Sequence, residues 1–122
     1  MPSKNSIRVY SADAYYHIYN RGVNKSDIFI DSTDYAVFLS FLKRHLSDKS
    51  EKDAKNREYA NYSNEVELLA FCLMPSHFHL LIHQKTSEAF TMLLRSVCTA
   101  YTMYFNKKYK RVGHLFQDRF KA

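Results

Sequence analysis

The spacing of hydrophobic and polar positions along the chain predicts a strand followed by a helix. Residues 15–19 read YYHIY, a run of aromatic and branched side chains typical of a strand, and Asn20-Arg21-Gly22 follows as a turn. Asp31 or Ser32 can cap a helix whose apolar side chains recur every three or four residues. These side chains are Tyr35, Phe38, Leu39, Leu42 and Leu46.

The middle of the chain predicts a loop and then a hairpin. Residues 47–64 read SDKSEKDAKNREYANYSN, and we expect a polar loop insertion there that adds nothing to the core. Residues 66–74 are almost continuously apolar, Pro75-Ser76 turns the chain, and residues 77–83 alternate between apolar and polar. Two antiparallel strands joined by a tight turn fit this pattern.

The last third of the chain predicts a long helix and one short strand. Ser87 is a plausible N-cap, and the helical spacing continues until Gly113. Its apolar positions are Phe90, Leu93, Leu94, Val97, Tyr101, Tyr104 and Phe105. With a strand over residues 114–120, the order becomes βαββαβ, which favours an α+β, ferredoxin-like fold with an antiparallel sheet and both helices on one face.

Composition sets the class of partner without naming it. The 122 residues fit a single domain, 1–122, and the net charge of +6 favours a polyanion, either nucleic acid or a membrane surface. No apolar run is long enough to span a bilayer and residues 1–7 lack a signal-peptide core, so we expect a cytoplasmic protein without a membrane partner. Cys72 and Cys98 are expected to be free, buried thiols.

Two histidines provide the sharpest chemical feature. Side chains two apart on a strand project from the same face with Cα atoms ~6.5 Å apart, so His77 and His79 can converge on one cation. His83 shares that face, whereas Phe78, Leu80 and Ile82 point the other way. A spacing of this kind is also common on strands that simply face water. Candidates for a third ligand are Cys72, His83 and His17.

Basic residues gather toward the end of the second predicted helix and beyond it, where they can follow phosphates or complement the helix dipole. Tyr15 and Tyr19 are candidates for stacking on unpaired bases, as is Tyr109, whereas the helical spacing of Tyr101 and Tyr104 favours the core. The candidate DNA-binding residues are Arg21, Arg95, Lys107, Lys108, Lys110, Arg111 and Arg119.

Three segments, in this order, resemble one known family. They are YNRG at 19–22, CLMPSHFHLL at 72–81 and GHLFQDRFK at 113–121. From about Tyr15 to its end, the chain is similar to the REP-associated, or IS200-like, single-tyrosine HUH transposases. The second segment is far more specific than two histidines alone.

The resemblance implies an activity and a metal. His77 and His79 would be the histidine pair that holds Mg²⁺ or Mn²⁺ against the scissile phosphate of single-stranded or hairpin DNA. A tyrosine on a later helix would attack, leaving a 5′-phosphotyrosine that allows strands to be rejoined. That tyrosine is followed four residues later by an Asn or Gln ligand, and no tyrosine here has that context. We therefore expect the catalytic helix beyond Ala122 and no catalytic residue within this chain, with monomer and homodimer both open.

Two other kinds of function remain open. A nucleic-acid-binding module without catalysis has the same element order, as in RNA-recognition folds, although histidines stand where that fold places its stacking rings. A structural metal site built from His77, His79, His83 and Cys72 is the third interpretation.

Overall fold

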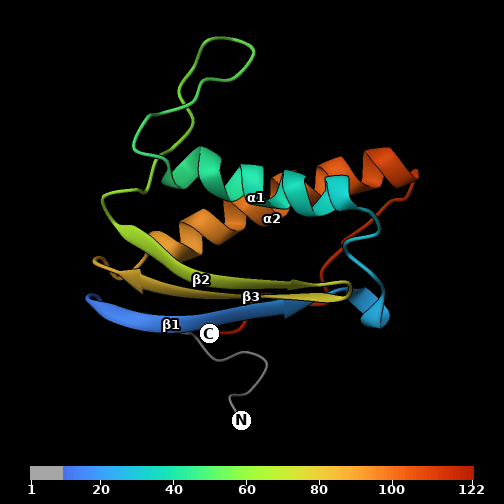
Figure 1. Ribbon diagram of the computed structural model, residues 1–122, viewed down its shortest axis with the longest axis horizontal. Coiled ribbons are helices and arrows are strands. Elements are labelled where there is room, and N and C mark those ends of the chain that lie inside the picture. The colour runs from blue at the N-terminus through green and yellow to red at the C-terminus, as the bar shows by residue number, and fades with distance from the viewer. Residues whose placement is uncertain (1–9) are drawn as a thin grey trace.

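The computed structural model describes residues 10–122, which form a three-stranded antiparallel sheet with two helices on one of its faces (Figure 1). In chain order the elements are β1 (Ala14–Arg21), the 3₁₀ turn η1 (Val23–Lys25), α1 (Ser32–Leu46), β2 (Val66–Met74), β3 (His77–Gln84) and α2 (Ala89–Tyr109). The strand order is β1-β3-β2, so β3 is central. This arrangement confirms the α+β fold with helices on one face.

Alternation along β3 divides the sheet into a buried and an open face. Phe78, Leu80 and Ile82 are 0–1% exposed and lie under the helices. His77 and His79, which flank Phe78 in the sequence, therefore project from the other side. We call that side the open face. It carries the even-numbered residues 70–74 of β2 and the odd-numbered residues of β1 and β3, as the strand register requires.

The helices begin where their caps allow. Asp31, one of the two predicted caps, is the N-cap of α1, and the structure adds a reciprocal capping box between its side chain and Asp34. Helix α2 has Glu88 at its N-cap, one residue after the predicted Ser87, and it ends at Tyr109 rather than continuing to Gly113. Its end is set by Lys110, which adopts a left-handed conformation with φ 54°. Within residues 10–122, neither helix combines the length and the apolar character that crossing a membrane requires.

The predicted last strand is reduced to two isolated bridges. Gly22 pairs with Phe116 and Tyr19 pairs with Lys121, so the final segment runs antiparallel along the free edge of β1. From one bridge to the other, β1 advances three residues, from Tyr19 to Gly22, whereas the final segment advances five, from Phe116 to Lys121. Because the two lengths differ, the backbone hydrogen bonds cannot continue as a regular ladder between the bridges. The segment thus occupies the place of a fourth strand without forming one.

Two further expectations are corrected by burial. Residues 47–64 extend above α1 as a loop in Figure 1, but Tyr62 is only 7% exposed and joins the core because its backbone N–H donates to the carbonyl of His45.

Cys72 is exposed, because its position on β2 faces away from the helices. Cys98 is partly buried, and burial raises the pKa of its thiol to about 12. Both cysteines are free, as expected.

A buried carboxylate joins the start of α1 to the end of α2. Asp34 is 0% exposed and accepts hydrogen bonds from the hydroxyls of Tyr104 and Tyr109, both at 2.6 Å. The Lys108 ammonium donates to it at 2.9 Å, and the backbone N–H of Ile30 does so at the same distance. Burial would raise the pKa of the Asp34 carboxyl, but these donors together hold it well below its usual value.

The Asp34 network predicts loss of stability in acid. A carboxyl whose pKa is lower in the folded state stabilises the fold fully above its unfolded pKa, about 4, and this contribution disappears as the pH falls below that value. We expect the free energy of unfolding, measured with urea, to fall more steeply from pH 5 to pH 2.5 in the unsubstituted chain than in Asp34→Asn. Equal pH dependence of the two chains would contradict this prediction.

Candidate metal and nucleic-acid site

The register of the three strands gathers the predicted ligands on the open face. On β1, Tyr19 lies opposite His79 and Arg21 lies opposite His77. On β2, Cys72 lies opposite His79 and Met74 lies opposite His77. Directly opposite side chains in an antiparallel pair are near neighbours on one face. The histidine pair is therefore flanked by an aromatic ring and a cation on one side and by sulfur atoms on the other.

The histidine rings form an ordered group. His77 and His79 have ring centroids 5.0 Å apart with planes at 89°. On the other side, His17 lies nearly parallel to His79 at 5.0 Å and 13°, and its Nε2 is 2.8 Å from Nδ1 of His79. Tyr19 stacks on His17 at 5.2 Å and 26°. Three imidazoles and one phenol thus share a small area of the open face.

The pKa of the His79 imidazole is lowered by its surroundings. Burial lowers its pKa, and the neighbouring His77 and His17 lower it further because a second positive charge nearby is unfavourable. A neutral imidazole retains a lone pair, which is the form that binds a metal ion.

A hollow surrounds the histidine pair, and we call it the histidine hollow. Its lining residues are Tyr19, Asn20, Arg21, Lys25, Ser76, His77, His79, Gln117, Asp118 and Lys121. The cations among them come from β1, the turn after it and the final segment, which meet here because that segment follows the edge of β1. An anion such as a phosphate is the kind of group that this lining attracts.

Gly22 joins the end of β1 to the turn between β2 and β3. Its N–H donates to the carbonyl of Ser76 at 2.9 Å. A Cβ atom at this position would lie 2.1 Å from the backbone oxygen of Ser26. The close approach of these backbones therefore requires glycine.

His77 and His79 can supply two of the ligands that a metal ion needs. Within residues 10–122, no three His, Cys, Asp or Glu side chains are grouped closely enough to hold an ion, so the structural site of His77, His79, His83 and Cys72 was wrong. His83 instead contacts Asp13 at 2.9 Å. Two adjacent imidazoles suit Mn²⁺, and either Mn²⁺ or Mg²⁺ can complete its coordination with water and phosphate oxygens.

The predicted DNA contacts separate into two groups. Arg21 lines the histidine hollow, whereas Arg95 and Lys107 on α2 and Lys110 at its C-cap are exposed on the other side of the sheet. Lys25 was missed by the sequence analysis, although its place four residues after Arg21 in a turn was a usable signal.

Two other predicted contacts have neighbours of their own, and a third is exposed. The Lys108 ammonium pairs with Asp31 at 2.8 Å and with Asp34, so a phosphate would have to displace a carboxylate. Arg111 donates to the side chain of Asn106 and to the carbonyl of His114. Arg119 is exposed in the final segment.

The tyrosines considered for stacking on bases also differ in their exposure and in the side of the sheet on which they lie. Tyr15 is 69% exposed and Tyr19 is 39% exposed, both on the open face. Tyr109 is partly buried and donates to Asp34. Tyr101 is fully buried, as its helical spacing predicted. Of these four tyrosines, only Tyr15 and Tyr19 lie on the face that carries the histidine pair.

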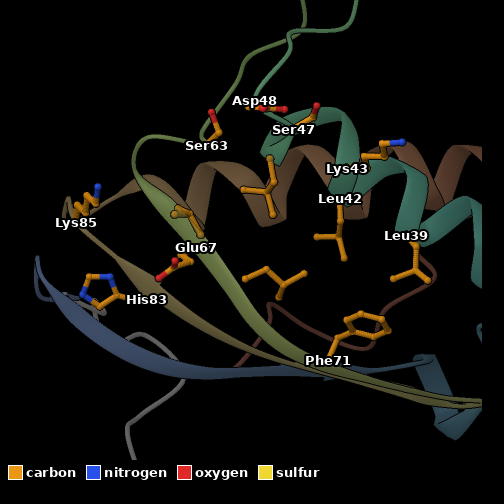
Figure 2. A pocket seen from close by; sticks show the side chains of 13 residues that line it. Leu39, Leu42, Lys43, Ser47, Asp48, Ser63, Glu67, Phe71, His83 and Lys85 are labelled. Carbon is orange, nitrogen blue, oxygen red and sulfur yellow. The ribbon is translucent and has the colours of Figure 1, made fainter.

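A second hollow lies between α1 and β2. In Figure 2, Leu39 and Leu42 point from the helix toward Phe71, which points from the strand toward them. Lys43 and Lys85 lie among the polar residues around it. Its lining includes His83, a candidate third ligand, but neither His77 nor His79 and none of the predicted DNA contacts, so this hollow is separate from the histidine pair on the open face.

An antiparallel sheet with two helices on one face and a histidine pair on the other defines the class of this protein as an α+β domain, and sequence comparison supplies the family. The family model described as "Transposase IS200 like" matches residues 11–122. The chain therefore belongs to the IS200-like transposase family. No curated protein matches it.

Solved structures support the same fold. The chain is 13% identical to a REP-associated tyrosine transposase bound to a REP hairpin, with a TM-score of 0.62 over 98% of this chain, and it spans 60% of that protein. It is 12% identical to a candidate transposase from Deinococcus radiodurans R1, with a TM-score of 0.58, over 99% of this chain and 82% of that one. At such identities the likeness concerns the fold alone.

Proposed function

We propose that this chain supplies the metal-binding and DNA-binding part of a transposase that nicks and rejoins single-stranded or hairpin DNA through a 5′-phosphotyrosine. The observation that carries the proposal is the His77 and His79 pair inside a hollow lined by cations. A bound Mg²⁺ or Mn²⁺ would polarise the scissile phosphate and offset its developing negative charge. IS200-like transposases are generally metal-dependent, which supports this proposal.

The residues of the chain have separate roles in this proposal. His77 and His79 hold the ion, while Arg21, with Lys25 beside it, binds the phosphates on either side of the scissile bond. Tyr15 and Tyr19 stack on unpaired bases along the open face. The exposed cations of α2 are proposed to contact another part of the DNA.

We assign the nucleophile to a tyrosine outside residues 10–122, in keeping with the family resemblance. Tyr104 and Tyr109 are unsuitable because burial raises their pKa values and their hydrogen bonds to Asp34 raise them further. Both hydroxyls lie in the helix layer, on the side of the sheet away from the histidines. Tyr101 donates its hydroxyl to the carbonyl of Ile28 and is fully buried.

A covalent-adduct assay tests the proposal. The full natural protein is incubated with Mg²⁺ or Mn²⁺ and hairpin DNA that carries a labelled single-stranded flank. We expect a protein–DNA adduct in which the DNA 5′-phosphate is attached to tyrosine, together with a free 3′-hydroxyl product. Tyr19→Phe serves as a control, because a stacking residue is not required for the covalent bond. Cleavage that proceeds in a chelator, or without an adduct, would contradict the proposal.

The second candidate is a nucleic-acid-binding module without catalysis. It is favoured by the cations and exposed aromatic rings on the open face, which suffice for binding single strands without any metal. The two candidates differ in the adduct assay. Tight binding of a single strand that neither depends on metal nor leads to an adduct would support the module.

The cation of Arg21 predicts a change in the salt dependence of DNA binding. Arg21→Gln should reduce the slope of log affinity against log salt by about 1, because one phosphate contact is lost. Fluorescence anisotropy with a hairpin DNA measures this slope. Arg57→Gln is the matched control, since Arg57 lies in the 47–64 loop and pairs with Asp53. An unchanged slope for Arg21→Gln would remove this residue from the interface.

A further inference from the structure

We infer that His17 is a positioning residue that presents the metal-binding nitrogen of His79, an inference that rests on the proposed function. The resemblance assigns the metal to His77 and His79 and gives His17 no role. A contact between two rings that are 62 positions apart in the chain connects them.

The contact determines which nitrogen of His79 can bind a metal ion. Nε2 of His17 lies 2.8 Å from Nδ1 of His79, so Nδ1 is already engaged and a cation cannot reach it. Nε2 of His79 is therefore the nitrogen left for the ion. His17 in turn uses its own Nε2 in this contact, which makes it a partner of the ligand rather than a third ligand.

The same contact selects a tautomer of His79. A hydrogen bond between two neutral imidazoles holds one hydrogen atom between two nitrogens. A nitrogen that binds a metal has no hydrogen, so His79 must carry its proton on Nδ1 and donate it to His17. Metal-binding histidines commonly donate their other ring N–H to a fixed acceptor, which orients the ring and strengthens the ligand.

His17 is held well enough to act as a fixed acceptor. Its ring lies nearly parallel to two neighbours, His79 with centroids 5.0 Å apart and Tyr19 at 5.2 Å, and these two rings are themselves 5.9 Å apart. Its backbone is part of the β1–β3 ladder, where it pairs with Leu81. Rotation of the His79 ring about its Cβ–Cγ bond would break its hydrogen bond to Nε2 of His17 and would disturb the parallel arrangement of the two rings.

Manganese binding to the 122-residue chain tests the inference without requiring cleavage. Mn²⁺ affinity is measured by calorimetry for the unsubstituted chain, His17→Phe and His17→Gln. Phenylalanine keeps an aromatic ring but accepts no hydrogen bond, and we expect its affinity to be about 10- to 100-fold weaker. The Gln side-chain oxygen can take the place of Nε2 as acceptor, so His17→Gln should bind within a few-fold of the unsubstituted chain.

Controls separate this inference from the proposed function. His114→Phe changes an exposed histidine in the final segment and should leave Mn²⁺ affinity unchanged. If His17→Phe binds Mn²⁺ as tightly as the unsubstituted chain, the inference is overturned while the proposed function stands. The same holds if His17→Phe and His17→Gln lose Mn²⁺ affinity equally. Absence of Mn²⁺ binding by the unsubstituted chain would overturn the proposed metal site and this inference with it.

A spectroscopic measurement tests the tautomer directly. In ¹⁵N-labelled chain saturated with Mg²⁺ at pH 8, long-range ¹H–¹⁵N correlations should identify His79 as protonated on Nδ1. Protonation on Nε2 would overturn the inference and leave the roles of His77 and His79 as ligands to the binding experiment.

Discussion

Replacing His77 and His79 together with alanine is expected to reduce DNA cleavage by the full natural protein by about 10³-fold or more. The two imidazoles are the only histidines of the described region that line the histidine hollow, so their loss removes the proposed protein ligands of the ion. Stability should change little, because both side chains project from the open face rather than into the core. The rate of adduct formation and the urea midpoint together measure the two effects.

His83→Ala is the matched control for that pair. His83 belongs to the same strand and the same face but contacts Asp13 and lies outside the histidine hollow. Its substitution should leave cleavage within a few-fold of the unsubstituted protein. Full cleavage by the double variant would end the assignment of this chain as a metal-dependent nickase, whereas equal losses in both variants would point to damage of the whole strand.

Asp34→Ala is expected to lower the free energy of unfolding by about 3–4 kcal/mol, the largest effect on stability that we predict for one residue. The substitution leaves the hydroxyls of Tyr104 and Tyr109 without their acceptor and the Lys108 ammonium without its buried partner. It also removes half of the capping box of α1. Urea unfolding of the 122-residue chain measures the loss.

Asp27→Ala provides a matched control on an exposed aspartate in the segment before α1. Its effect should stay within about 0.5 kcal/mol. A loss below about 1 kcal/mol for Asp34→Ala would mean that water replaces the carboxylate at low cost, and the network would then not be a main link between the helices.

Local sequence patterns predicted the structure correctly where the interacting residues are close in sequence. The turn at Pro75-Ser76 lies between two runs of strand-like residues, so the hairpin and its bounds were predicted closely. Alternation on β3 was enough to put His77 and His79 on one face and Phe78 on the other. The cap at Asp31 likewise depends only on its neighbours three residues away.

Errors arose where a residue depends on elements distant in sequence. Cys72 belongs to an apolar run, yet its burial depends on which side of β2 the helices cover. Tyr62 belongs to a polar run but reaches the core through a hydrogen bond to His45. The last strand was lost because the spacing between its bridges differs from that of β1, a mismatch that a single segment does not reveal.

The amino-acid sequence by itself determined the order of elements up to the second helix, two candidates for the cap of the first helix, the two faces of β3 and the family, because periodicity and motifs are properties of neighbouring residues. Only the tertiary structure decided that His17 meets His79, that Lys25 joins Arg21 around the histidine hollow, and that Lys108 serves a buried carboxylate. Those contacts depend on strand register and on how the helices pack against one another. Both are set by the free energy of the whole fold rather than by any one segment.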